Sequence, residues 1–170
     1  MRQAAISATL QSDHSQVQDT KILYAELKPA MEAVAIPLFD FSKQCLRDRG
    51  NFLPHAAVLT GEGKIALVAA QTERDLTNAT EVLPLLQGSL RALVKQKGYS
   101  AIGIAENVNI TIPGQSATDA IKVLFEHQRG LTVALYVPFS KKFLRGYVFG
   151  DMISMLAQPE VNAWPSSATT

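Results

Sequence analysis

The sequence lacks most of the features that tie a protein to one chemistry. It contains a single cysteine, Cys45, so no disulfide can form within the chain, which fits a reducing compartment. No apolar run approaches the ~20 residues that a membrane-spanning helix needs. Residues 1–20 have no continuous apolar stretch of the kind that a signal peptide carries. We therefore expect a soluble, cytoplasmic protein.

An excess of one charge is also missing. The chain has 16 Lys and Arg residues against 15 Asp and Glu residues, which gives a net charge of +1 at pH 7. Such a balance supplies no overall attraction to an anionic membrane or to nucleic acid. We expect no membrane contact, and a nucleic-acid partner ranks last among the interpretations.

Metal-binding spacings are missing as well. The sequence has no His-x-His, His-x-x-x-His or Cys-x-x-Cys pattern. Zinc or iron would need about three protein ligands in tight geometry. We therefore expect no metal and no cofactor.

The composition is that of one globular domain with ragged ends. A chain of 170 residues with 47% apolar residues is long enough to bury a sizeable core. Both ends are polar and aperiodic. We expect a flexible segment over residues 1–20, one domain over residues 21–157, and a flexible tail over residues 158–170 that Trp164 tacks onto the domain.

Two segments have the periodicity of helices that bury one face. Residues 21–49 and 80–97 carry apolar residues spaced three and four apart. The first stripe contains Leu27, Met31, Val34, Leu38, Phe41 and Cys45, and the second contains Leu83, Leu86, Leu90, Leu93 and Val94. Pro37 removes a backbone donor within the first segment, so we expect a kink there or two helices meeting near Ala35.

The rest of the pattern predicts strands. Residues 53–60 and 64–71 flank a glycine-rich turn and form a hairpin that is apolar on both faces, as in strands covered on both sides. Further strands are predicted over residues 101–112, 120–128 and 131–137, a sixth strand or an aromatic loop over residues 143–149, and a short helix over residues 151–157.

The expected strand register gives the fold class. Pairing Ile112 near Asp119 and His127 near Leu131 gathers the apolar residues of three strands on one face, which both helices would cover. The fold class is then α+β, with an antiparallel sheet of about five strands and two main helices packed on it. The element order is α-β-β-α-β-β-β-short α.

This element order and the hairpin at residues 56–65, AAVLTGEGKI, resemble the Roadblock family and its profilin-like relatives. In that family a helix precedes a two-strand hairpin, a second helix and three antiparallel strands. The resemblance covers about residues 21–137. The segment Phe52-Leu53-Pro54 with the hairpin also resembles small bacterial α+β proteins to which no function is attached. Roadblock-like domains act as dimerising scaffolds or regulators, so the resemblance implies that role and supplies no catalytic residues.

Glu106 and His127 are the first candidates for a site. Each occupies a core-parity position in a strand, and the expected register places them on one face within a residue or two of each other. A carboxylate beside an imidazole is the arrangement of a base with its orienting partner. The alternative is that both lie at wet strand ends. His55 opens the first strand and would be a third polar group of a pocket between the sheet and the first helix.

A second candidate is the segment over residues 140–147. Lys141, Lys142 and Arg145 stand there among aromatic residues and a glycine, a composition that suits a phosphate clamp or an RNA-binding patch. The alternative is a solvated surface loop. Cys45 lies near a helix C-terminus, where the dipole does not activate a thiol, and we expect it to be a small buried hydrophobe.

These observations favour a non-catalytic regulatory or scaffolding interaction module, homodimeric and with an unidentified protein partner. Its contact surface would be an exposed apolar strip on the last strand or the final helix. The alternative is a small-molecule-binding protein or minor enzyme with a pocket near Glu106 and His127.

Overall fold

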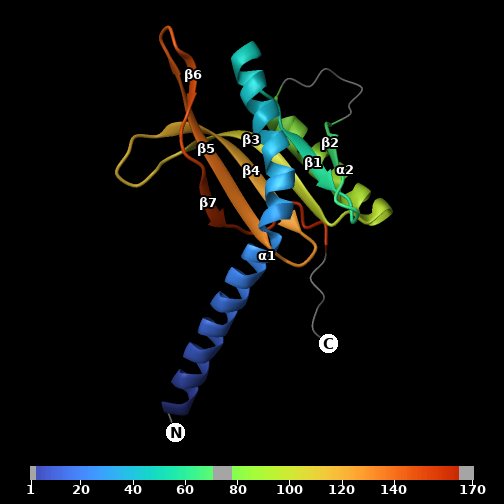
Figure 1. Ribbon diagram of the computed structural model, residues 1–170, viewed down its shortest axis with the longest axis vertical. Coiled ribbons are helices and arrows are strands. Elements are labelled where there is room, and N and C mark those ends of the chain that lie inside the picture. The colour runs from blue at the N-terminus through green and yellow to red at the C-terminus, as the bar shows by residue number, and fades with distance from the viewer. Residues whose placement is uncertain (1–2, 71–77, 165–170) are drawn as a thin grey trace.

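The fold consists of two helices and a seven-stranded antiparallel sheet (Figure 1), in a computed structural model that describes residues 3–70 and 78–164, with side chains from Gln16 onward. The helices are α1 (Gln3–Arg49) and α2 (Ala79–Lys97). The strands are β1 (His55–Leu59), β2 (Ile65–Val68), β3 (Ala101–Ile110), β4 (Thr118–His127), β5 (Thr132–Lys142), β6 (Gly146–Phe149) and β7 (Ile153–Leu156). Within these ranges, neither helix has an apolar stretch sufficient to span a bilayer. The α+β class and the antiparallel sheet are confirmed, with seven strands instead of about five.

Helix α1 is longer than the sequence pattern predicted. It continues through Pro29 and Pro37, so the alternative of two helices near Ala35 is wrong. The ribbon bends about where the helix reaches the sheet (Figure 1). Residues 3–20, expected as part of a flexible segment, form its first turns. The predicted stripe packs on the sheet, and Cys45 is buried in it as expected, although Phe41 is 45% exposed.

A glycine in β3 lets α1 lie close to the sheet. A Cβ atom on Gly103 would collide with Val34 and would lie 2.9 Å from Leu38 Cδ1. Glycine is therefore required by a close helix–sheet approach and not by a turn. Small residues flank it on the same face, since Ala101 and Ala105 are both fully buried there.

The two helices cover opposite faces of the sheet. The sheet order is β2-β1-β3-β4-β5-β6, with β7 beside β5. Odd-numbered residues of the central strands, such as Phe125, pack with α1. Even-numbered residues, such as Ile102 and Ile104, pack with α2 through Leu86 and Leu90. The expectation that both helices cover one face is therefore wrong.

The reason is the register of β3 against β4. Asp119 pairs with Asn109 and not near Ile112, a difference of three residues from the prediction. Because side chains alternate between the faces, an odd shift moves every residue of one strand to the other face. The predicted register of β4 against β5 is confirmed, since the N–H of His127 donates to the carbonyl of Leu131 at 2.9 Å.

The sheet edges also differ from the prediction. Strand β2, expected to be central or covered, is an edge strand, and Leu67 on it is 58% exposed. The short strand predicted within residues 143–149 is present as β6. The helix predicted over residues 151–157 is instead strand β7, which pairs with β5. Backbone groups of β5 would otherwise lack partners, and pairing satisfies them.

The chain beyond β7 returns across the face that α2 covers. Val161 and Ala163 are 1% and 3% exposed there, and Trp164 packs against the same core. Residues 158–164, expected to belong to a flexible tail, are thus held on the sheet in part, with Trp164 in the predicted role. The remainder of that tail, residues 165–170, lies outside the described residues, as do residues 71–77 at the predicted end of the hairpin.

Candidate functional site

The structure separates Glu106 from His127, the pair expected to form a base and its orienting partner. Glu106 lies opposite Lys122 on β4, whereas His127 lies opposite Ala101 at the other end of β3. Even positions pair with even positions between these strands, so the two side chains also point to opposite faces of the sheet. They do not form one site.

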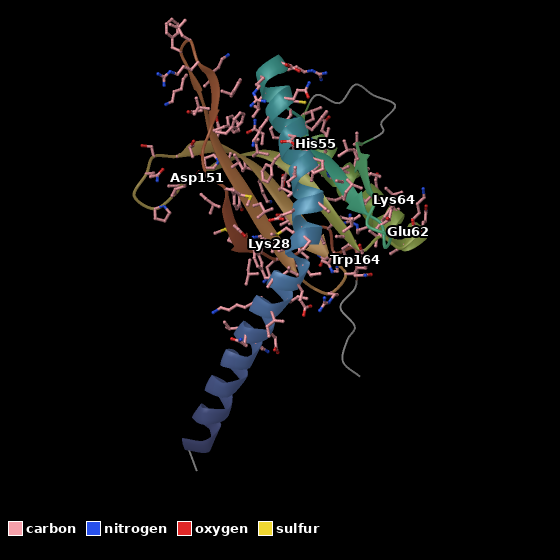
Figure 2. All side chains as sticks on the ribbon, viewed as in Figure 1. Lys28, His55, Glu62, Lys64, Asp151 and Trp164 are labelled. Carbon is pink, nitrogen blue, oxygen red and sulfur yellow. The ribbon has the colours of Figure 1, made fainter. Side chains whose placement is uncertain are left out.

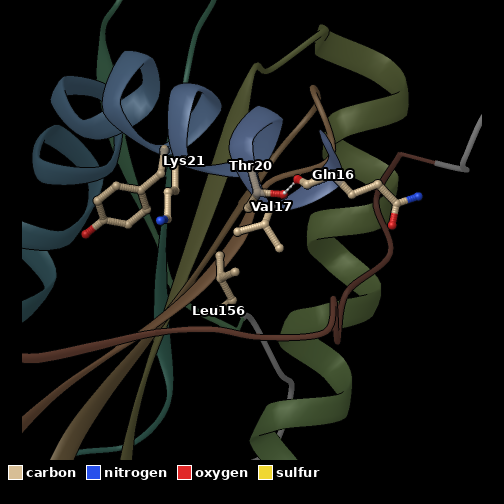
Figure 3. A pocket seen from close by; sticks show the side chains of 6 residues that line it. Gln16, Val17, Thr20, Lys21 and Leu156 are labelled. Carbon is tan, nitrogen blue, oxygen red and sulfur yellow. Dashed lines mark hydrogen bonds between the residues drawn. The ribbon is translucent and has the colours of Figure 1, made fainter. Parts of the chain in front are cut away.

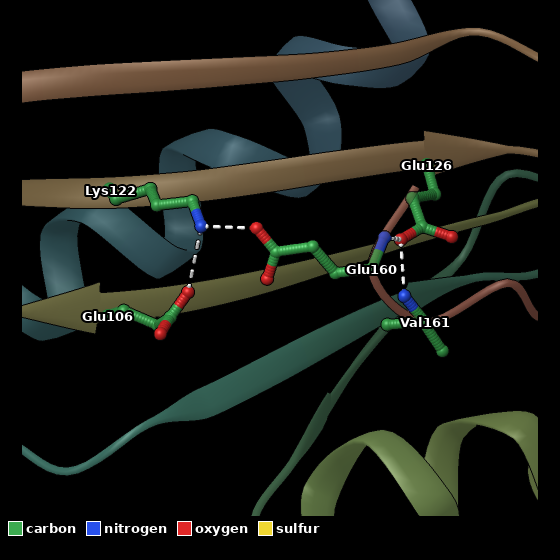
Figure 4. Close-up of polar contacts among 5 residues, drawn as sticks. All are labelled: Glu106, Lys122, Glu126, Glu160 and Val161. Atoms are coloured by element: carbon green, nitrogen blue, oxygen red, sulfur yellow. Dashed lines mark hydrogen bonds and ion pairs between the residues drawn. The ribbon is translucent and has the colours of Figure 1, made fainter. Parts of the chain in front are cut away.

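Glu106 belongs instead to a chain of three charges (Figure 4). Lys122 Nζ lies 3.2 Å from Glu106 Oε2 and 2.6 Å from Glu160 Oε1. Burial opposes the charge on Lys122, but the hydrogen bond to Glu160 and the charges of both carboxylates outweigh it and raise the pKa of the lysine. Through Glu160, the lysine holds the segment after β7 on the sheet. Because Glu106 is paired with the same lysine, its carboxylate is not a free base.

Glu126 is the polar residue that the sequence interpretation missed. Its side chain is 3% exposed, and its carboxylate accepts hydrogen bonds from the backbone N–H groups of Glu160 and Val161 at 2.7 Å (Figure 4) and from that of Asn162 at 3.2 Å. Three donors satisfy a carboxylate that would otherwise be costly to bury. The only signal in the sequence was an acidic residue within an apolar strand, because its partners are backbone groups that no pattern identifies.

His127 borders a polar hollow at the turn between β4 and β5. Its side chain is 8% exposed, and its Nδ1 accepts a hydrogen bond from the N–H of Arg129 at 3.1 Å. Burial, followed by the positive charge of Arg129, lowers the pKa of His127, which favours the neutral ring. The hollow has a volume of about 570 Å³ and is lined also by Thr132, Asn162 and Trp164. No residue of α1 lines this hollow, so it is not the predicted pocket between the sheet and the first helix, and His127 is the only one of the three predicted polar groups in it.

His55 lies between α1 and the sheet (Figure 2) and not in that hollow. Its Nδ1 is 3.0 Å from the carbonyl oxygen of Leu53, and its Nε2 is 3.2 Å from Ser42 Oγ. The rings of Phe41 and Phe52 meet it edge to face. Burial lowers the pKa of His55 despite the neighbouring carbonyl groups. This histidine therefore joins α1 to β1 and is 7% exposed.

The described residues hold no group of three His, Cys, Asp or Glu side chains placed to bind a metal ion. His55 lies opposite Ala105 of β3 and His127 opposite Ala101, so the two histidines share a face but lie on opposite sides of β3 and four residues apart along it.

The predicted cationic segment forms a hairpin beside the end of α1. Lys141 and Arg145 line a hollow of about 410 Å³ together with Arg47 and Arg49 of the helix. The hydroxyl of Tyr147 donates to the carbonyl of Gly50 at 3.2 Å, which joins the hairpin to the helix end. The structure thus adds Arg47 and Arg49 of the helix to the predicted basic segment.

An apolar groove lies at the other end of the molecule, between α1 and β7 (Figure 3). It has a volume of about 450 Å³, and Val17, Thr20, Tyr24 and Leu156 line it with Gln16 and Lys21 at its rim. Val17 is 53% exposed and Leu156 is 61% exposed. The hydroxyls of Tyr24 and Ser154 lie 3.1 Å apart and join the helix to the strand.

Comparison of the chain with protein-family models, with curated proteins and with solved structures finds no match. The resemblance to Roadblock and profilin-like domains therefore stays an interpretation of element order and of one hairpin.

Proposed function

We propose that this protein is a non-catalytic regulatory or scaffolding interaction module that works as a homodimer through the groove between α1 and β7. The observation that carries the proposal is that the stripe of α1 continues beyond its buried part into this open groove beside β7. From Gln16 onward, Leu27 is the first buried residue of the stripe on α1, at 7% exposure. Tyr24, Thr20 and Val17 continue its spacing of three and four toward the N-terminus, and Val17 is already half exposed.

The dimensions of the helix support a contact beyond the chain's own sheet. Helix α1 has 47 residues, which at the usual rise per residue is about 70 Å. The longest strand, β5, has 11 residues, or about 36 Å. Figure 1 shows the N-terminal part of α1 projecting away from the sheet. Because helices in water gain most of their stability from packing an apolar face, a projecting helix is well suited to bind a partner.

A second copy of the chain is the partner that fits this surface best. Each chain offers both an open helix face and an apolar groove beside it, so two copies related by a two-fold axis bury both at once. Among the described side chains that line the groove, Lys21 is the one with a charge. The similarity in element order to Roadblock-like domains, which act as dimerising scaffolds, supports the same role.

Native mass spectrometry of the full chain tests the proposal. We expect a dimer mass that changes to a monomer mass in the Val17→Glu/Leu156→Glu variant, because both charges would be buried at the interface. The matched control is Leu67→Glu/Leu85→Glu, which places the same charges at residues that are 58% and 49% exposed on β2 and α2. The control should remain a dimer. A monomeric wild-type protein at micromolar concentration would refute the proposal, as would a dimer that survives the first variant.

The same spectra address the alternative of a small-molecule-binding protein or minor enzyme. Its supporting observation is the polar hollow beside His127, although Glu106 does not reach it. Additional mass that disappears on denaturation and is lost in His127→Ala would favour that alternative. Additional mass unaffected by this variant would argue against it.

A further inference from the structure

The hairpin of β5 and β6 ends in two apolar side chains that nothing in the described chain covers. Phe143 and Leu144 are 92% and 91% exposed. Leu144 has a φ of 64°, a left-handed conformation that a leucine seldom adopts, so the tight turn displays both side chains at its apex. Figure 1 shows this hairpin extending past the body of the sheet. Large apolar side chains presented together on a projection are typical of an interaction site.

Cations surround this apex. Lys141 and Lys142 precede it and Arg145 follows it directly, and all three are exposed. The end of α1 adds two more on the adjoining surface, where Arg47 and Lys43 lie over the ring of Phe149 at 5.3 and 5.4 Å. The aromatic ring and the hairpin backbone thus hold the cations behind the apex.

The concentration of positive charge is local. Residues 43–50 carry three cations and one anion, and residues 140–150 carry three cations and no anion, a net charge of +5. The whole chain has a net charge of +1, so the remaining residues have a net charge of −4. The near-neutral total, from which no membrane contact was expected, therefore conceals a strongly basic end.

We propose that this end of the molecule docks on an anionic lipid bilayer, with Phe143 and Leu144 inserted at the interface and the cations on the lipid headgroups. Apolar side chains at an interface are buried about 5–10 Å below the headgroups. One residue of a strand advances about 3.4 Å, so Lys142 and Arg145 remain at headgroup depth when the apex is inserted. Burial of the two apolar side chains favours binding, and so does the attraction of the cations to the negative potential of the lipid surface.

A bilayer fits these residues better than a discrete phosphate or a nucleic acid. The hollow between the hairpin and α1 lies at a helix C-terminus, whose partial negative charge disfavours a bound phosphate, and Asp48 also lines it. Single-stranded nucleic acid is held by stacking on aromatic rings, which Phe143 provides but Leu144 does not. A diffuse anionic surface with an apolar interior matches both the cations and the leucine. The inference does not depend on the dimer contact, which lies toward the opposite end of α1 (Figure 1).

Co-sedimentation of the full chain with vesicles tests the proposal. We expect binding to phosphatidylcholine vesicles that contain phosphatidylserine, weaker binding to phosphatidylcholine alone, and loss of binding as salt is raised. No binding to the anionic vesicles at low salt would overturn the proposal.

Two variants and two matched controls assign the binding to the hairpin. Neutralising its cations with Lys141→Gln, Lys142→Gln and Arg145→Gln should weaken binding roughly 100-fold, because each cation near an anionic surface contributes about a fivefold factor. The charge-matched control replaces three cations elsewhere, in the form Lys64→Gln/Lys95→Gln/Lys97→Gln, and should bind nearly as the wild type does. Equal losses in the two triple variants would mean adsorption by net charge and would overturn the proposal.

The apolar apex is tested in the same way. Phe143→Ser/Leu144→Ser should weaken binding at least tenfold, because two large apolar side chains no longer leave water. The control Leu67→Ser/Leu85→Ser removes two exposed apolar side chains from β2 and α2 and should leave binding unchanged. The replaced apex side chains are almost fully exposed, so folding should be retained, and an unchanged thermal midpoint would verify this.

Insertion is read directly from a single tryptophan at the apex. In Trp164→Phe/Phe143→Trp, we expect the emission to shift to the blue on anionic vesicles and to be quenched by brominated lipid. Binding without shift or quenching would overturn the inserted geometry. Tight, salt-sensitive binding of single-stranded RNA that depends on Phe143 but not on Leu144 would overturn the bilayer in favour of nucleic acid.

Discussion

Replacement of Glu126 by alanine should release residues 158–164 from the sheet. The carboxylate accepts three backbone hydrogen bonds from this segment, and those donors would lose their partner. Hydrogen bonds to a charged group contribute roughly 1.5–3 kcal/mol each, so the segment would detach and hydrate its donors instead of staying docked without partners. The loss of stability is then limited to the free energy with which residues 158–164 dock on the sheet.

Burial in the docked segment sets the size of the effect. Val161 is 1% exposed and Ala163 is 3% exposed, and Trp164 packs on the same core. Full burial of a valine side chain stabilises by roughly 1.5–3 kcal/mol, and the smaller and partly buried neighbours add to it. We expect Glu126→Ala to lower the free energy of unfolding by only about 3 kcal/mol, because the conformational entropy that the released segment regains offsets much of the lost burial and hydrogen bonding.

Urea unfolding measures this loss, and the fluorescence of Trp164 locates it, because Trp164 is the only tryptophan. Its emission should shift to the red in Glu126→Ala before any global unfolding. Glu126→Gln keeps an acceptor oxygen without the charge and should have an intermediate effect. Asp119→Asn, an exposed carboxylate on the same strand, is the control and should change stability by less than about 0.5 kcal/mol. Unchanged emission together with unchanged stability in Glu126→Ala would refute the role of Glu126 as a tether.

Two further predictions concern the core. Burial lowers the pKa of both His55 and His127 below 6.5, so the unfolded chain takes up these protons first, and stability should be complete above pH 6.5 and fall as the pH drops below it. Urea unfolding between pH 7.5 and 5 should show this fall, and His55→Gln/His127→Gln should flatten it; an equal slope in the variant would contradict the assignment. Gly103→Ala should destabilise by about 1–3 kcal/mol through collision with Val34 and Leu38, and Val34→Ala in the same chain should recover part of the loss. A neutral effect of Gly103→Ala in thermal or urea unfolding would show that α1 can move away from the sheet.

The elements that were predicted well are those whose signal is local. The stripe on residues 21–49 and the second helix follow from spacing alone, and in the structure the side chain of Asn78 caps α2 by accepting a hydrogen bond from the N–H of Thr80. The predicted β4–β5 register was correct because the tight turn at Arg129-Gly130 permits only one pairing of the two strands. The longer connection between β3 and β4 leaves several pairings open, and there the prediction was three residues off.

The error in the β3–β4 register also explains why the predicted site of Glu106 and His127 does not form. The predicted register placed Glu106 near His127, but the sheet pairs Glu106 with Lys122. Lys122 and Glu126 then find their partners in the segment beyond β7. A contact between a strand and a distant extended segment leaves no periodic trace in a sequence. The conversion of residues 151–157 into a strand has the same cause, because the free edge of β5 decides it.

The sequence by itself determined the α+β class, the position of α2, the C-terminal end of α1, the buried cysteine and the apolar strands, because each depends on residue spacing within a few turns or one hairpin. Only the tertiary structure decided which face each strand presents, which helix covers it, and that the cations of residues 43–49 and 141–145 gather at one end of a nearly neutral chain. These properties depend on pairings between segments far apart in the chain. Their energies are set by packing and by satisfied backbone hydrogen bonds, which exist only once the sheet has formed.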